Sequence, residues 1–219
     1  MATDGNAAYY GHPRREMEPF VPADAAKLLD VGCGAGAFAA TLRAARPDRR
    51  LEIWGVELDA GAAARATGAV DHVLAGDALE RLAALPDAGF DCVVCNDVLE
   101  HLAEPAALLR QARRVLRPQG ALVASVPNVR YFFNVVDLAV HGRWDYADEG
   151  ILDRTHLRFF TRGSLRRLLE EEGFDVRIMQ GINPTGSLKF TLVNLATGGR
   201  WADMRWLQYA VVARPRGRT

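Results

Sequence analysis

Residues 27–36, which read Lys-Leu-Leu-Asp-Val-Gly-Cys-Gly-Ala-Gly, constrain the fold of this chain more than any other stretch. An apolar run ends there in three alternate glycines, Gly32, Gly34 and Gly36, and residues 37–45 are expected to form a helix. Glycine lets the backbone turn sharply and approach a ligand closely, because no Cβ intervenes. The helix would direct its free N–H groups and positive dipole end into the same crevice. Strand-to-helix turns without a ligand also use glycine, so the rest of the chain must decide whether a nucleotide-like cofactor sits here.

Strands and helices alternate along the chain up to residue 126. The apolar runs expected to form strands are residues 28–31, 51–56, 70–74, 90–95 and 121–126, with helical patterns between them at 37–45, 60–67, 79–85 and 105–116. Nearly continuous apolar strands in this alternation predict a doubly wound α/β fold, whose mostly parallel sheet is covered on both faces. The pattern changes after Pro127. The elements expected there are helices at 129–140 and 162–172, with strands at 175–179 and 206–213.

The length of 219 residues predicts a single domain over residues 1–219. Residues 1–24 are polar and interrupted by proline, which favours an N-terminal arm or lid. Two later segments are expected to form a variable cap: the first, 127–160, is aromatic and then irregular, and the second, 183–203, is rich in Gly, Thr and Asn.

Composition narrows the class of partner. The chain has 27 basic and 27 acidic residues, and this balance argues against nucleic acid or an anionic membrane. No apolar run reaches the roughly 18 residues that a membrane span needs, and the polar N-terminus lacks the core of a signal peptide. Three cysteines do not predict a disulfide framework. We therefore expect a cytoplasmic protein that acts on a small molecule.

Cys92 and Cys95 form a Cys-x-x-Cys pair, which elsewhere can indicate zinc or redox chemistry. Here the pair lies in an expected strand, and residues three apart on a strand point to opposite faces. No second pair exists to complete four zinc ligands. The pair therefore predicts two small core residues.

Polar residues follow the ends of the next expected strands. Glu57 ends the second strand, where an acidic side chain in a doubly wound sheet reaches ribose hydroxyls; the alternative is a solvent-exposed Glu. Asp77 follows the third strand and could accept from an exocyclic amine, cap the next helix, or do both. Asn96 begins another polar group after the fourth strand. These positions share the edge at which open α/β folds bind ligands.

Taken in order, five segments resemble the successive motifs of class I S-adenosylmethionine-dependent methyltransferases, over about residues 27–126. The segments are Asp30-Val-Gly-Cys-Gly-Ala-Gly36, Gly55-Val-Glu-Leu-Asp59, Gly76-Asp77-Ala78, Phe90-Asp-Cys-Val-Val-Cys-Asn-Asp-Val-Leu-Glu-His101 and Leu116-Arg-Pro-Gln-Gly-Ala-Leu122. The later segment Asp153-Arg-Thr-His-Leu-Arg-Phe-Phe-Thr161 is similar to a branch often found with bacterial cell-surface polysaccharide and secondary-metabolite genes. The resemblance implies a seven-stranded, Rossmann-like sheet with an antiparallel last pair.

The resemblance also assigns residues to S-adenosyl-L-methionine. Its methionyl end would be held by the loop residues, namely Asp30, Gly32, Cys33, Gly34 and Gly36. Cys33 occupies the variable place between glycines, so only its backbone is expected to act. The nucleoside would be held by Glu57 at the ribose, by Leu58, Asp77 and Ala78 at the adenine, and by the Asn96 backbone along the pocket. Tyr10 and Arg15 could cover the cofactor as a lid, or lie on a helix that only packs on the sheet.

On the acceptor side, His156 is the candidate general base, since a neutral imidazole near pH 7 can take a hydroxyl proton. The alternative is a histidine that anchors the turn over residues 153–161. Asp153, Arg154 and Arg158 could hold a polar acceptor or form structural ion pairs. The aromatic residues Tyr131 and Trp144 could line the acceptor site, pack in the core, or form a homodimer contact. His101 is expected to be structural.

The function expected from these features is methyl transfer to a small polar acceptor, through a hydroxyl of a sugar or secondary metabolite. One alternative is a scaffold that binds the cofactor without catalysis. Another is a nicotinamide-dependent oxidoreductase, which the alternate glycines and the Asp77 and Asn96 positions disfavour. We expect no metal, because the acidic and His residues show no recognisable ligand spacing.

Overall fold

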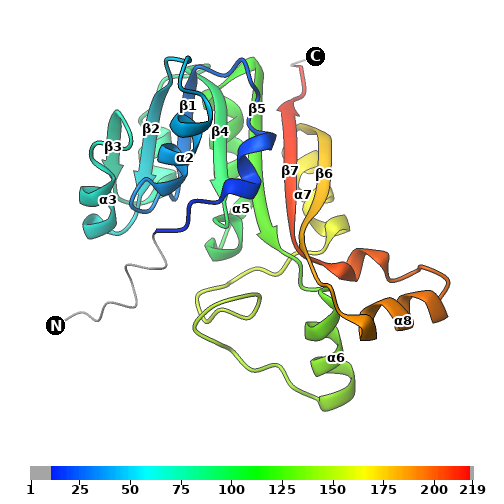
Figure 1. Cartoon of the computed structure of the whole chain (residues 1–219). Coiled ribbons are helices and arrows are strands. Elements are labelled where there is room, and N and C mark those ends of the chain that lie inside the picture. The colour runs from blue at the N-terminus through cyan, green and yellow to red at the C-terminus, as the bar shows by residue number, and fades with distance from the viewer. Residues whose placement is uncertain (1–10, 218–219) are drawn as a thin grey trace.

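The computed structural model describes residues 11–217 and contains one sheet of seven strands, in the order β3-β2-β1-β4-β5-β7-β6 (Figure 1). The strands are β1 Lys27–Val31, β2 Glu52–Glu57, β3 His72–Ala75, β4 Phe90–Asn96, β5 Leu116–Pro127, β6 Phe174–Pro184 and β7 Trp206–Pro215. Strands β1 to β5 pair in parallel, while β7 is antiparallel to both β5 and β6. The predicted doubly wound sheet with an antiparallel last pair is confirmed.

Helices cover both faces of this sheet because its strands are apolar on both sides. The helices of the first face are α4 Ala78–Ala83, α5 Pro105–Val115 and α7 Arg162–Glu171, and those of the second are η1 Arg15–Phe20, α2 Ala37–Ala45 and α3 Ala60–Ala66. Cys95 packs in the first core and Cys92 in the second, and both are fully buried. The prediction that these thiols point to opposite faces is confirmed.

Strand β5 begins at Leu116, earlier than the expected residue 121. Leu116 pairs with Phe90, and the register then shifts so that Cys92 faces Ala121. Residues 117–120 bulge out of the ladder between these pairs. Pro118, which cannot donate a ladder hydrogen bond, is tolerated in such a bulge. A proline therefore interrupts the pairing without ending the strand.

The segments after β5 and β6 project beyond the carboxyl ends of the parallel strands (Figure 1). They contain α6 Phe132–His141, α8 Leu188–Ala196 and the short η3 Ala202–Arg205, which share a small core of Phe132, Phe190 and Met204. Helix α8 lies in a segment expected only as an insertion, where the Ser187 side chain caps its first turn. The assignment of these segments to a cap stays a prediction.

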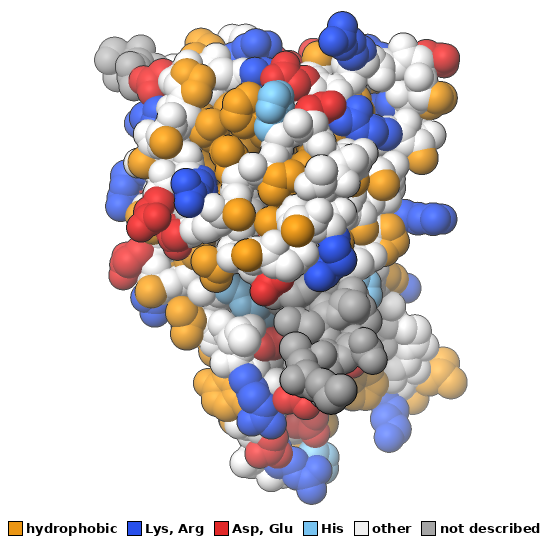
Figure 2. Space-filling model, turned by 90° about the vertical axis from the view of Figure 1, so that its left-hand side faces the viewer, with side chains coloured by type: hydrophobic (Ala, Val, Ile, Leu, Met, Phe, Trp, Pro, Cys, Tyr) orange, Lys and Arg blue, Asp and Glu red, His pale blue; other side chains and the backbone are white. Residues whose placement is uncertain are grey.

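The surface around β3 and α3 carries no single sign of charge, since basic and acidic side chains lie intermingled there (Figure 2). Within residues 11–217, no helix has the length and apolarity needed to cross a membrane.

Candidate functional site

The loop between β1 and α2 has a conformation that only glycine accommodates easily. Gly32, Gly34 and Gly36 have φ values of +72°, +54° and +82°. A Cβ on Gly32 would lie 2.8 Å from Val98 Cγ2, and one on Gly36 would lie 2.6 Å from Ala69 Cβ. The Gly32 and Cys33 amides donate to the Val56 carbonyl, which ties the loop to the end of β2. Three of the five loop residues therefore carry no side chain, which allows a close approach to a ligand.

Glu57 joins the end of β2 to this loop. Its side chain is 6% exposed, its Oε2 accepts from the Gly34 amide at 2.8 Å, and its Oε1 accepts from the Asp59 amide at 2.9 Å. A carboxylate offers about four acceptor positions, so further donors can still bind. The two backbone bonds fix the carboxylate beside the glycine loop.

Asp30 lies at the end of β1 and is 4% exposed. Its Oδ2 has no hydrogen-bond partner among residues 11–217. Burial, together with the nearby Glu57 carboxylate, raises the pKa of Asp30 to about 7. A buried acceptor without a donor is costly, so this oxygen is suited to a polar or cationic ligand group.

Asn96 ends β4, which pairs with β1, so it lies at the same edge as Asp30. Its side-chain oxygen and nitrogen are both buried, and neither has a partner in the part of the chain that the structure describes. Asp77 follows β3 and caps α4, with Oδ1 accepting from the Leu79 and Glu80 amides at 2.9 and 3.1 Å. Capping occupies Oδ1 and leaves Oδ2 as a second acceptor on an exposed side chain.

The other residues expected at the cofactor have different surroundings. The Cys33 thiol is buried and faces Gly55, where a Cβ would lie 2.6 Å from the sulfur. The side chain thus packs in the core, in keeping with a role for the Cys33 backbone alone. Leu58 is 74% exposed, and Ala78 begins α4 in a half-buried position.

A polar network that the sequence analysis missed ties the N-terminal segment to this edge. Arg14 forms an ion pair with Asp97 and donates to Ser125 Oγ at 3.0 Å. Ser125 Oγ donates to Asp97 Oδ1 at 2.8 Å, and Gln208 Nε2 lies 3.0 Å from both Asp97 oxygens. Arg14 and Asp97 both have positive φ values, of 45° and 53°. The network therefore joins the N-terminal segment to the ends of β4, β5 and β7.

The predicted lid residues are placed differently. Tyr10 lies outside the described residues. Arg15 is exposed and makes no ion pair or hydrogen bond with residues 11–217. No sequence signal separates these adjacent arginines, because the left-handed turn at Arg14 decides which one points inward.

A third cluster contains Glu100, His101 and His156. Glu100 is 1% exposed, and neither of its carboxylate oxygens has a partner within the described ranges. Burial raises the pKa of Glu100 to about 8. His156 is 8% exposed with Nδ1 at 2.9 Å from the Ile151 carbonyl, and its ring centroid lies 4.7 Å from that of His101. His156 is thus held by one nitrogen, while its other nitrogen belongs to the cluster.

The remaining residues expected at the acceptor make local contacts. Arg154 pairs with Asp148 at 3.0 Å, and Arg158 donates to the Ala103 carbonyl at 3.0 Å. Asp153 Oδ1 accepts from the Thr155 amide and hydroxyl. Tyr131 is half-buried beside Phe133, and Trp144 packs edge-on against Phe159. These contacts correspond to the structural alternative for each side chain.

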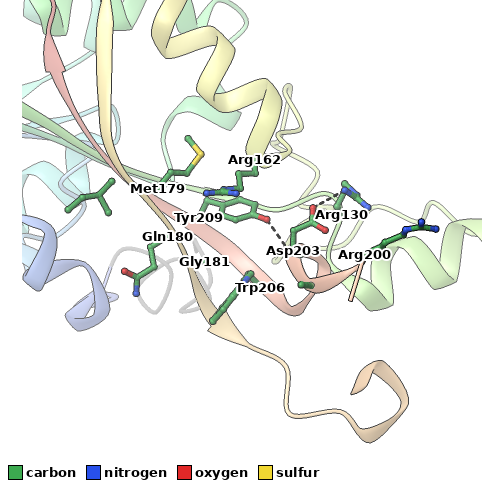
Figure 3. A pocket seen from close by; sticks show the side chains of 11 residues that line it. Arg130, Arg162, Met179, Gln180, Gly181, Arg200, Asp203, Trp206 and Tyr209 are labelled. Atoms are coloured by element: carbon green, nitrogen blue, oxygen red, sulfur yellow. Dashed lines mark hydrogen bonds and ion pairs between the residues drawn. The ribbon is translucent and has the colours of Figure 1, made fainter. Parts of the chain in front are cut away.

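A cavity of about 790 Å³ lies elsewhere, beside β6, β7 and η3 (Figure 3). Arg130, Arg162 and Arg200 line it, and Arg130 pairs with Asp203 at 2.8 Å. None of the residues expected at the cofactor or acceptor lines this cavity. The glycine loop is therefore the candidate functional site because of its backbone conformation and the buried polar atoms near it, and cavity volume does not contribute to that choice.

Comparisons with known proteins identify the family of this chain. A curated relative, a ubiquinone biosynthesis O-methyltransferase of Psychrobacter arcticus, is 29% identical over 173 residues, covering 72% of this chain and 62% of the relative. A second protein of that name, from Xylella fastidiosa, is 34% identical over 113 residues, with 49% and 44% covered. The chain thus spans about half the length of these relatives.

Solved structures share the fold. A SAM-dependent methyltransferase from Archaeoglobus fulgidus superposes with a TM-score of 0.68 at 21% identity, covering 95% of this chain and 94% of the other. An S-adenosylmethionine-dependent methyltransferase from Mesorhizobium loti gives a TM-score of 0.64 at 21% identity, covering 93% and 98%. A family model described as a methyltransferase domain matches residues 7–177, which is most of the chain. With the glycine loop and its acidic partners in place, the chain belongs to the methyltransferase-domain family.

Proposed function

We propose that this protein transfers a methyl group from S-adenosyl-L-methionine to a hydroxyl of a small polar acceptor, such as a sugar or secondary metabolite. The observation that carries the proposal is a pair of buried polar groups at the strand ends near the glycine loop. Asp30 Oδ2, at the end of β1, and the Asn96 amide, at the end of the adjacent β4, are buried without partners among residues 11–217. Native proteins rarely leave such atoms unpaired, so a polar ligand fits this place.

The residues present fit the cofactor. Asp30 and the loop through Gly36 would hold the methionyl end, where Asp30 can accept from a cationic amine. Glu57 would accept from the ribose hydroxyls, and the exposed Leu58 would pack against the adenine. Asp77 Oδ2 would take the adenine amine beside Ala78. When bound, S-adenosylmethionine supplies a methyl group activated by a positively charged sulfur.

The protein's own contribution to transfer is position and proton handling. Oxygen as the methylated atom is supported by relatives that bear the name O-methyltransferase. The acceptor hydroxyl would lose its proton at the cluster that contains His156, whose Nδ1 contact with Ile151 fixes the ring. Tyr131 and Trp144, on the segment after β5, would line the acceptor side.

Calorimetry and an acceptor screen test this function. The full chain should bind S-adenosylhomocysteine in preference to NAD. When it is given S-adenosylmethionine and a set of hydroxyl acceptors, it should form S-adenosylhomocysteine as a product with at least one of them. Binding of NAD alone would identify the oxidoreductase alternative. Binding of S-adenosylhomocysteine with no turnover across sugars, phenols and amines would identify the non-catalytic scaffold.

A further inference from the structure

We propose that Glu100, His101 and His156 bind one divalent transition-metal cation of the zinc or manganese class. One ligand atom from each of these three residues lies within 4.8 Å of the others, in the only group of this kind found among residues 11–217. Glu100 and His101 end the turn η2 Leu99–His101, and His156 comes from the irregular segment after α6. The site would therefore join the sheet edge to the segment that follows α6.

The three ligand atoms could close on one ion with a modest movement. Ligand atoms about 2.1 Å from one tetrahedral cation lie about 3.4 Å apart. A separation of up to 4.8 Å therefore needs up to about 1.4 Å of adjustment, which side-chain rotation can provide. Two imidazoles and one carboxylate are a common donor set for zinc, manganese and iron(II).

Glu100 supplies an independent argument for a cation. Glu100 is 1% exposed, and both of its carboxylate oxygens are buried and lack partners in the described part of the chain. Buried carboxyl groups are normally paired, hydrogen-bonded or bound to metal. Arg14, a cation that interacts with Glu100, is paired with Asp97. Among residues 11–217, the Glu100 oxygens thus have no hydrogen-bonded cationic partner.

The backbone around Glu100 holds the two segments together. The Glu100 carbonyl accepts from the Leu157 and Arg158 amides at 2.8 and 3.0 Å. These bonds place His156 opposite Glu100 through the main chain. The cluster is thus set by the fold and not by the rotamer of one surface side chain.

Hydrogen bonds also orient both imidazoles as ligands. His156 Nδ1 lies 2.9 Å from the Ile151 carbonyl, which can only accept, so Nδ1 carries the proton and Nε2 keeps its lone pair. Thr155 Oγ1 donates to Asp153 Oδ1 at 2.7 Å, so it accepts from His101 Nδ1 at 3.0 Å. His101 Nε2 then also carries a lone pair. Such second partners, a carbonyl for one histidine and a carboxylate-bound hydroxyl for the other, are typical of metal ligands.

Three protein ligands would leave positions on the cation for an acceptor oxygen. This catalytic use rests on the proposed function, whereas cation binding does not. A coordinated hydroxyl would release its proton to water more easily, and its oxygen would form the new O–C bond as the C–S bond breaks. His156 would then act as a ligand, not as the base. No metal was expected from the sequence, because its acidic and His residues show no recognisable ligand spacing.

The test measures cation binding to the full chain without cofactor or acceptor. After removal of metal with a chelator, calorimetry with Zn²⁺ and Mn²⁺ should show one site for at least one of these ions, and Co²⁺ should give a d–d absorption band. Glu100→Gln and His156→Ala should each weaken binding at least tenfold, while His141→Ala, at the exposed end of α6, should leave it unchanged. Failure of Zn²⁺ and Mn²⁺ to bind, or equal affinity in all variants, would overturn the site.

Thermal melting shows whether the variants fold. Metal-free Glu100→Gln should melt at or above the temperature of the metal-free parent, because it removes a buried carboxyl without changing volume. The bound ion should raise the melting temperature of the parent but not of Glu100→Gln. An equal rise in both would contradict the proposal. If the parent protein bound a cation but did not bind S-adenosylhomocysteine, that result would contradict the proposed function and would not affect the proposed cation site.

Discussion

The Glu57 carboxylate accepts a hydrogen bond at 2.8 Å from the backbone amide of Gly34, 23 positions earlier in the chain. The bond fixes a loop residue to the end of the neighbouring strand. One side chain therefore shapes the glycine loop and presents further acceptor positions beside it.

Glu57→Ala should weaken S-adenosylhomocysteine binding by about 1.5–3 kcal/mol, the value of hydrogen bonds to a charged group. That loss corresponds to about a 10- to 150-fold rise in Kd by calorimetry. Glu171→Ala, at the exposed end of α7, is the matched control and should not change Kd. An unchanged Kd for Glu57→Ala would exclude a role in binding.

Gly36→Ala should lower the free energy of unfolding by about 2–4 kcal/mol and abolish cofactor binding. The new Cβ would combine a φ of +82° with a 2.6 Å approach to Ala69 Cβ. Gly142→Ala tests strain alone, since its φ is +63° and its Cβ would meet open space. Denaturant unfolding should show a loss of about 1–2 kcal/mol for this control, with binding intact.

Arg14→Ala should cost about 1.5–3 kcal/mol of stability, because it leaves Asp97 and Ser125 without their cationic partner. Arg15→Ala should change stability by less than about 0.5 kcal/mol. Equal effects of the two substitutions in urea unfolding would show that the Arg14 network does not hold the N-terminal segment.

The free energy of unfolding should fall as the pH rises from about 4 to about 7, because folding raises the pKa of Asp30. Its pKa is raised to about 7 in the folded protein, against about 3.9 when unfolded, so the native state binds more protons between these values. The Asp30 contribution is fully present below about pH 4 and is lost as pH rises through 7. Melting temperatures measured from pH 5 to 8 should show this decline, and Asp30→Asn should flatten it. If the melting temperature of Asp30→Asn depended on pH in the same way as that of the parent, the pKa of Asp30 would not be raised by folding.

His156→Ala should lower turnover by about a hundredfold or more and leave S-adenosylhomocysteine affinity nearly intact. A loss of bound cation in parallel would identify His156 as a ligand, and retained cation would identify it as the base. If His156 is only an anchor, turnover should fall in proportion to the folded fraction measured by circular dichroism.

Sequence periodicity predicted most of the fold because the parallel strands are buried on both faces. The runs around Leu29, Ile53 and Val93 contain few polar residues, and each precedes a helix with a recognisable start. Helix α8 was not predicted because Thr, Asn and Gly dominate the composition around it. Its exposed leucines, Leu188, Leu192 and Leu195, follow helical spacing, which only a residue-by-residue reading would reveal.

Parts of the candidate site were predictable where a residue's place along a strand fixes its position in the sheet. Glu57 ends β2 and Asp77 follows β3, so both were expected at the carboxyl edge of the sheet. The surroundings of Glu100 were not predictable, since its carbonyl accepts hydrogen bonds from the Leu157 and Arg158 amides, which belong to a distant segment. The inward turn of Arg14 likewise depends on a local φ of 45° that its sequence does not specify.

Asp97 contacts one residue from the start of the described chain, Arg14, and one from its last strand, Gln208. This arrangement has a consequence for biosynthesis. A chain emerging from the ribosome can form β1 to β5 and the glycine loop before β7 exists, but it cannot complete the contacts of Asp97. The network around Asp97 is therefore complete only after the last strand has been synthesised and inserted between β5 and β6.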